Sequence, residues 1–132
     1  MSDYLFTYGT LHPERAPEEI AASVAKLRAV GEGFVHGVLY DLGDYPGAVL
    51  DPPSQQKIAG TVFQLPEEED VLRQLDQYEG FNPDAPDKSL FLRKRCTVTL
   101  ASGRTLQCWL YVYNGTPEPA RILATGYIAS KA

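Results

Sequence analysis

The chain has few of the residues that form metal sites or disulfide bonds. Its 132 residues include two cysteines, Cys96 and Cys108, and two histidines, His12 and His36. Neither pair has the spacing of a zinc-ligand set or of two ligands on one helix face, so the sequence predicts no bound metal. The cysteines flank a predicted hairpin turn. We expect them to remain thiols in a reducing cytosol, and a disulfide across the two strands is the alternative.

The sequence also lacks a long apolar run and an excess of positive charge. Its first residues, Met1-Ser2-Asp3 and then Tyr4-Leu5-Phe6, have neither the basic start nor the apolar stretch of a signal peptide or membrane helix. The net charge of -5 has the wrong sign for nonspecific binding to nucleic acid. We therefore expect a cytoplasmic protein that has no nucleic-acid or membrane partner.

The chain does have the size and composition of one domain, which we expect to span residues 1–132. Hydrophobic residues make up 44% of it, enough to build a single core. One predicted helix of about three turns follows Pro17, and a second runs from Pro66 to Tyr78. Gly31 and Gly33 are expected to separate the first helix from the next strand. The predicted strands are residues 4–8, 34–40, 45–50, 58–65, 90–100 and 105–113.

These strands and helices do not alternate regularly along the chain. This order favours an α+β domain with a mixed, mostly antiparallel sheet over a doubly wound parallel sheet. The connections are short enough for the sheet to close into a small barrel, a point that periodicity alone leaves open.

Glu79 is the main candidate for chemistry. The apolar residues of the second predicted helix share an arc of about 120 degrees that also contains Glu79; they are Val71, Leu72, Leu75 and Tyr78. If the helix extends that far, burial and the negative end of the helix dipole both raise the pKa of this carboxyl, which suits proton transfer. The alternative is a helix that frays earlier and leaves Glu79 solvated before Gly80.

The other polar residues considered are given no catalytic role. Asp76 and Arg73 lie at or beyond the polar flank of the helix and are expected to be solvated. Residues 93–95, Arg-Lys-Arg, alternate between the two faces of a strand, so at least one of them is expected to reach inward, without a catalytic role. Since no serine or cysteine has an evident histidine partner, the sequence does not support a catalytic triad.

Two aromatic patterns are weaker candidates. The first predicted strand ends in Tyr8-Gly9-Thr10-Leu11, where glycine permits a sharp turn whose amide groups suit an anion. Taken alone, this pattern is also that of an ordinary β-turn. Trp109, Tyr111 and Tyr113 alternate along one strand face, which is typical of core or pocket lining.

These pieces occur in an order that resembles the gamma-glutamylcyclotransferase-like family. The resemblance covers the chain from Tyr4 to about Tyr113, and its specificity comes from five motifs in register. They are Tyr8-Gly9-Thr10-Leu11, Gly37-Val38-Leu39-Tyr40 with Tyr45-Pro46-Gly47, Leu75-Asp76-Gln77-Tyr78-Glu79-Gly80, Phe91-Leu92-Arg93, and Trp109-Leu110-Tyr111-Val112-Tyr113.

The resemblance implies a small mixed β-barrel with flanking helices and an enzyme that needs no cofactor. The implied reaction closes a gamma-glutamyl amide or amine to 5-oxoproline and releases the amine, with Glu79 as general acid and base. By the same resemblance, Tyr8, Gly9, Thr10 and Leu11 bind the glutamyl part of the substrate. Tyr111 or Tyr113 would form a wall of the pocket, whereas Phe91 stands where many relatives have tyrosine and provides no hydroxyl.

Two alternatives to an enzyme remain open from the sequence. A protein of the same fold could bind an acidic small molecule without turnover, because a fold by itself does not define a function. An interaction domain would instead have a filled cavity and a Glu79 side chain turned to solvent.

Overall fold

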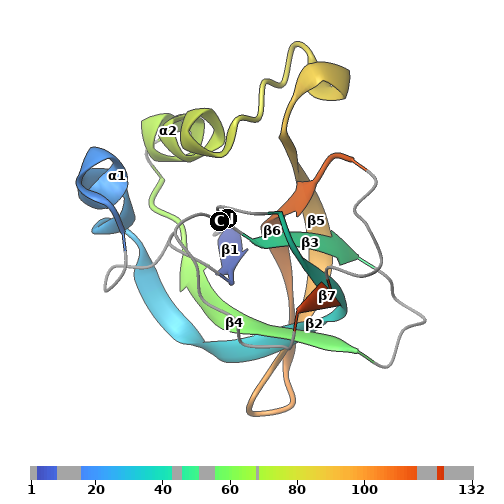
Figure 1. Ribbon diagram of the computed structural model, residues 1–132. Helices are drawn as coiled ribbons and strands as arrows, with labels where there is room; N and C mark the ends of the chain where they lie inside the picture. The colour runs from blue at the N-terminus through green and yellow to red at the C-terminus, as the bar shows by residue number, and fades with distance from the viewer. Residues whose placement is uncertain are drawn as a thin grey trace.

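The computed structural model describes residues 3–8, 16–42, 46–50, 56–67, 69–115 and 122–123 (Figure 1). The described elements are, in chain order, β1 (Tyr4–Thr7), α1 (Glu18–Val24), β2 (Arg28–Asp41), β3 (Pro46–Leu50), β4 (Lys57–Gln64), α2 (Glu69–Glu79), the 3₁₀ helix η1 (Pro86–Lys88), β5 (Phe91–Leu100), β6 (Thr105–Tyr113) and β7 (Ile122–Leu123). Each predicted strand corresponds to one of the first six strands, and β7 is an element that the sequence did not predict.

Five strands close into a barrel in the order β2, β4, β1, β6 and β5, with β5 pairing back to β2. The pairing of β1 with β6, at Leu5 and Trp109, is parallel, and the other pairings in the ring are antiparallel. The second half of β2 extends beyond this ring and pairs with β3 and β7. The predicted mixed, mostly antiparallel barrel is therefore confirmed.

Barrel closure depends on a glycine that the sequence pattern placed outside the strand. Gly31 and Gly33 lie within β2 instead of ahead of it, and a register shift falls between Ala29 and Gly31. At Gly33, where β2 meets β5, a Cβ atom would lie 2.7 Å from the carbonyl oxygen of Thr99. Glycine is required here because the two backbones approach too closely for a side chain.

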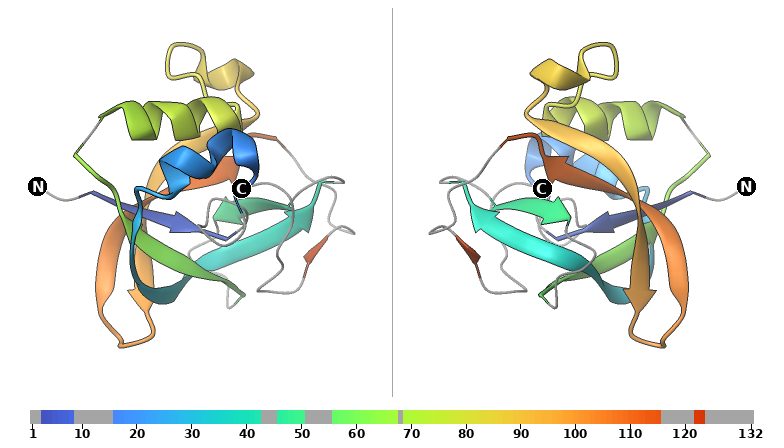
Figure 2. Two further views of the ribbon diagram at one scale, coloured as in Figure 1. Left: turned by 90° about the vertical axis from the view of Figure 1, so that its left-hand side faces the viewer. Right: turned by 90° about the vertical axis from the view of Figure 1, so that its right-hand side faces the viewer.

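The two helices lie together on one side of the barrel (Figure 2). α1 is shorter than the three predicted turns because its last residues form tighter turns, with Leu27 N–H donating to the carbonyl of Val24, before β2 begins at Arg28. α2 begins at Glu69 rather than at Pro66. Leu65 N–H still donates to the carbonyl of Asp3 at 2.8 Å, which keeps the chain extended up to that point.

The core fills the barrel and the layer between the barrel and the helices. On β6, Cys108, Leu110 and Val112 are buried, and the alternate residue Tyr111 is also buried because α2 covers its face. Ser23 of α1 donates a hydrogen bond to Gln74 of α2 and so links the helices. None of the described helices is long and apolar enough to span a membrane.

The two cysteines lie directly opposite each other on β5 and β6. The register pairs Cys96 with Cys108, and both are thiols in the structure, as expected. Burial raises the pKa of the Cys96 thiol to about 11. Burial and the neighbouring Cys96 raise the pKa of the Cys108 thiol to about 12.

Candidate active site

Glu79 is the last residue of α2, and its side chain is fully buried, with 0% exposure. The helix ends in a Schellman motif, in which Gly80 adopts a φ of 76°. Phe81 N–H donates to the carbonyl of Asp76 at 2.9 Å, and Gly80 N–H donates to that of Gln77 at 3.2 Å. These bonds hold the last turn to its end, so the helix does not fray before Glu79.

The burial of Glu79 decides between two pairs of alternatives that the sequence left open. A solvated Glu79 ahead of a glycine cap is contradicted, because the cap is present and the carboxyl is nevertheless inside the protein. The same observation contradicts the solvent-facing Glu79 that an interaction domain would have. Placing a carboxyl group in the core is costly, and this cost favours a functional reason for its position.

Two buried tyrosines lie within electrostatic range of Glu79. Tyr8 donates a hydrogen bond to the carbonyl of Tyr111 at 2.9 Å and accepts one from the N–H of Ala48 at 3.2 Å. Burial raises the pKa of Tyr8, the charge of Glu79 raises it further, and the Ala48 bond opposes the shift. The hydroxyl of Tyr8 therefore joins β1, β3 and β6 beside Glu79.

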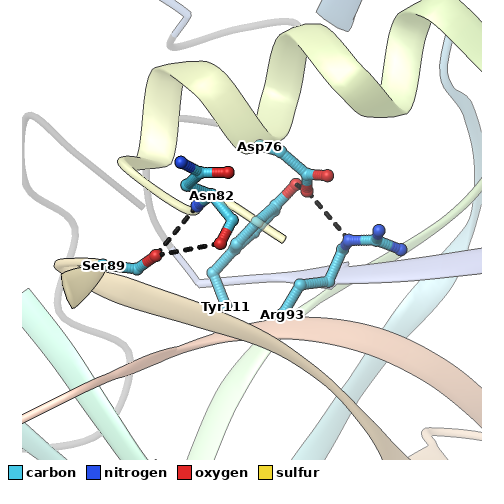
Figure 3. Close-up of polar contacts among 5 residues, drawn as sticks. All are labelled: Asp76, Asn82, Ser89, Arg93 and Tyr111. Atoms are coloured by element: carbon cyan, nitrogen blue, oxygen red, sulfur yellow. Dashed lines mark hydrogen bonds and ion pairs between the residues drawn. The ribbon is translucent and has the colours of Figure 1, made fainter. Parts of the chain in front are cut away.

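Asp76 belongs to the same interior and not to the solvated face that the helical wheel predicted. Tyr111 donates a hydrogen bond to its Oδ1 atom at 2.6 Å, and Arg93 Nε forms an ion pair with the same oxygen at 2.8 Å (Figure 3). On the wheel, Asp76 lies only about 40 degrees from Leu72. Partners on β5 and β6 draw it inward, and no periodicity within one helix can reveal partners on another element.

Arg93 is the inward-reaching member of residues 93–95. Its side chain is 16% exposed, and its guanidinium lies 4.4 Å from the ring centre of Trp109 and 5.7 Å from that of Phe81. The contact with Asp76 is an ion pair without the direction of a good hydrogen bond. Arg73 does remain on the solvated face, as predicted, where it pairs with Asp70 at 3.2 Å.

The charges of this cluster influence one another. Burial raises the pKa of Asp76, while the hydrogen bond from Tyr111 and the positive charge of Arg93 oppose the shift. The pKa of Tyr111 is raised well above its ordinary value by burial, then by the charge and hydrogen bond of Asp76, and further by the charge of Glu79, with Arg93 opposing. Asp76, Glu79 and Tyr111 thus form one coupled cluster.

The segment after α2 is pinned by Ser89, a buried residue that the sequence analysis did not single out. Its Oγ atom accepts from Asn82 N–H at 2.8 Å (Figure 3). It also donates to the carbonyl of Ala85 at 3.1 Å. Asn114, just past β6, donates from its side chain to the carbonyls of Ser89 and Pro86. The sequence signal for these contacts is the presence of Asn and Ser among prolines in this segment, since both side chains commonly form hydrogen bonds to nearby backbone groups.

The other predicted site residues are placed in part. Gly9, Thr10 and Leu11 fall outside the described residues. Tyr113 is half-buried, directly opposite the fully buried Phe91, with ring centres 6.0 Å apart. Within the described residues, no three His, Cys, Asp or Glu side chains gather as a metal site would require.

Thr7, immediately before Tyr8, is a further buried polar residue. It is 2% exposed, and its hydroxyl oxygen has no hydrogen-bond partner within the part of the chain that the structure describes. Such a hydroxyl carries a desolvation cost with no compensating bond.

The chain matches the model of a known protein family. A family model described as gamma-glutamyl cyclotransferase, AIG2-like, matches residues 5–129, and the chain belongs to this family. Gamma-L-glutamyl-butirosin B gamma-glutamyl cyclotransferase from Niallia circulans is 32% identical over 111 residues, or 83% of this chain. The chain spans 66% of that relative's own length.

Solved structures share the fold. An AIG2-like protein from Mus musculus is similar with a TM-score of 0.72 at 21% identity, over 95% of this chain and 86% of the mouse chain. YkqA from Bacillus subtilis is similar with a TM-score of 0.64 at 22% identity, over 89% of this chain and 38% of the other. The small barrel with two helices is thus the fold of the family, as the motif order implied.

Proposed function

We propose that the protein is a gamma-glutamyl cyclotransferase that converts a gamma-glutamyl amide or amine to 5-oxoproline and a free amine. The observation that carries the proposal is the fully buried Glu79 at the capped end of α2, beside Tyr8 and Tyr111. The 32% identical relative is named for cyclisation of a gamma-glutamyl compound, which supports the same reaction class.

The reaction requires one carboxyl group that exchanges protons. The substrate's α-amine attacks its own γ-carbonyl, so a new C–N bond forms as the original amide C–N bond breaks. Glu79 takes the proton that the α-ammonium must lose and later delivers one to the departing amine. Full burial disfavours a lasting negative charge on Glu79, and this suits a group that accepts a proton in one step and returns it in the next.

The first loop holds the other end of the substrate in this proposal. Backbone amides of residues 9–11 anchor the α-carboxylate, in the role that the family resemblance implies for them. Fixing the carboxylate holds the amine close to the γ-carbonyl. Binding energy then offsets part of the entropic cost of orienting the two reacting groups, which lowers the activation barrier. Tyr113 stays a proposed wall of the pocket.

The test is to incubate the protein with a panel of gamma-glutamyl amines, gamma-glutamyl dipeptides and glutathione and to measure 5-oxoproline. We expect release from at least one compound, its loss in Glu79→Gln, and its retention in Glu32→Gln, which changes an exposed glutamate on β2. Release that survives Glu79→Gln would remove this residue from the mechanism. Saturable binding of a panel compound without any release would identify a binding protein of the same fold.

A further inference from the structure

The hydroxyl of Tyr111 has its single proton committed to Asp76. The Oη to Oδ1 distance of 2.6 Å is that of a strong, charge-assisted hydrogen bond, and a phenol has only one hydrogen to donate. Toward any other group, Tyr111 can therefore act only as an acceptor. The hydrogen bond that the structure gives this hydroxyl is the one it donates to Asp76.

The guanidinium of Arg93, on β5, keeps Asp76 as a hydrogen-bond acceptor. Arg93 lies directly opposite Tyr111 in the β5–β6 register, and its Nε atom is 2.8 Å from the same Oδ1 atom that receives the Tyr111 proton. The stacking of Arg93 on Trp109 limits its freedom to turn elsewhere. One hairpin thus supplies both partners of Asp76.

The hydroxyl oxygen of Tyr111 lies beside Glu79, the proposed catalytic residue. Asp76 and Glu79 are one helical turn apart on α2, and the charge of Glu79 acts on the Tyr111 hydroxyl. The other phenol near Glu79 is less available, because Tyr8 both donates to the Tyr111 carbonyl and accepts from Ala48.

We propose that Asp76 and Arg93 fix the Tyr111 hydroxyl as a hydrogen-bond acceptor beside Glu79, and that this acceptor holds the substrate's α-amino group in place for attack. The inference rests on the proposed function. In it, Tyr111 contacts the substrate, whereas Asp76 and Arg93 are positioning residues that act through Tyr111. The site accordingly favours gamma-glutamyl compounds with a free α-amine over glutaryl compounds, which carry hydrogen in its place.

The first test compares a gamma-glutamyl amine with the matching glutaryl amine, which cannot cyclise and serves as a competitive inhibitor. In Tyr111→Phe, we expect KM for the gamma-glutamyl amine to rise about ten- to a hundredfold, the effect of losing a hydrogen bond to a charged group. The inhibition constant of the glutaryl amine should stay within about twofold. Tyr4→Phe on β1 is the control and should change neither constant. Equal losses for both compounds would overturn the proposal, since Tyr111 would then only shape the pocket.

The second test concerns the positioning pair. The double variant Asp76→Leu with Arg93→Met removes both charges together, because an apolar replacement of a buried ion pair is commonly tolerated. It frees the Tyr111 proton, so the same selective rise in KM is expected in a protein that unfolds at a similar temperature. A folded double variant with unchanged KM would overturn the positioning role.

Binding measurements separate this inference from the proposed function. If the wild-type protein releases no 5-oxoproline, the proposed function fails. Calorimetric titration with the same two compounds still tests whether Tyr111→Phe selectively weakens the one with the α-amine. Equal weakening, or none, would refute the role of Tyr111 whatever the outcome for catalysis.

Discussion

Gly80 offers a way to disturb Glu79 without altering its carboxyl group. In Gly80→Ala, the backbone must keep a φ of 76°, which costs a residue with a Cβ atom about 1–2 kcal/mol. For 132 residues, an unfolding entropy of about 2.1 cal/mol/K per residue converts this to a Tm decrease of about 4–7 °C. The new Cβ would also lie 3.3 Å from the Cβ of Leu90, so the chain has little room to shift on that side.

The same strain should reach the proposed active site at Glu79. The N–H groups of Gly80 and Phe81 close the last turn of α2, and relaxing that turn displaces Glu79. Because misplacement of a catalytic group by about 1 Å can reduce rates about a hundredfold, we expect kcat/KM to fall by at least about tenfold. Activity is measured as 5-oxoproline release well below Tm, so that only folded protein contributes.

Gly103 provides the matched control for strain alone. It lies at the tip of the β5–β6 hairpin with a φ of 92°, and a Cβ there would meet nothing within 4 Å. Gly103→Ala should therefore lower Tm by a similar amount while leaving kcat/KM unchanged. If Gly80→Ala loses stability but no more activity than Gly103→Ala, the helix cap does not position Glu79 and our reasoning is wrong.

Three further predictions concern the described core. Thr7→Val should raise the free energy of unfolding by about 1 kcal/mol in thermal or urea unfolding, since it removes a buried hydroxyl that has no hydrogen-bond partner among the described residues; a decrease would contradict this. Gly33→Ala should lower Tm by several degrees, because its Cβ would lie 2.7 Å from the Thr99 carbonyl oxygen. An unchanged Tm would show that β2 and β5 can move apart enough to accept a side chain. Cys96 and Cys108, with pKa values raised to about 11 and about 12, should resist a thiol reagent at pH 8 until the protein is unfolded. As the pH rises from about 9, the unfolded thiols ionise first, so stability should fall.

The sequence predicted best what depends on neighbours along the chain. Helical periodicity placed Glu79 on the buried stripe, because Leu75 and Leu72 lie one and two turns before it, and left open whether the helix extends that far. Gly80 marked the helix end for an equally local reason, the left-handed backbone that a Schellman cap needs. The loop at residues 9–11 stays a prediction from family resemblance.

The sequence failed where a residue is explained by a partner far along the chain. Asp76 has the local pattern of a solvated flank, and only the assembled barrel brings Tyr111 and Arg93 to its carboxylate. Gly33 has the local pattern of a break between elements, and only the approach of Thr99 on β5 shows why it belongs inside a strand. In both cases the deciding contact joins two elements that are remote from each other in sequence.

This difference also separates the two parts of the proposed site. The place of Glu79 on the apolar stripe depends on α2 alone, so a protein could keep this proposed general acid and base while its other contacts change. The orientation of the Tyr111 hydroxyl instead requires α2, β5 and β6 together, because its proton goes to Asp76, and Asp76 is held by Arg93. If Tyr111 holds the α-amine as proposed, a substitution of Tyr111, Asp76 or Arg93 should alter that contact while leaving Glu79 in place. The proposal therefore predicts that selectivity for the substrate changes more easily than the carboxyl group of Glu79, and the comparison of gamma-glutamyl with glutaryl compounds measures that selectivity directly.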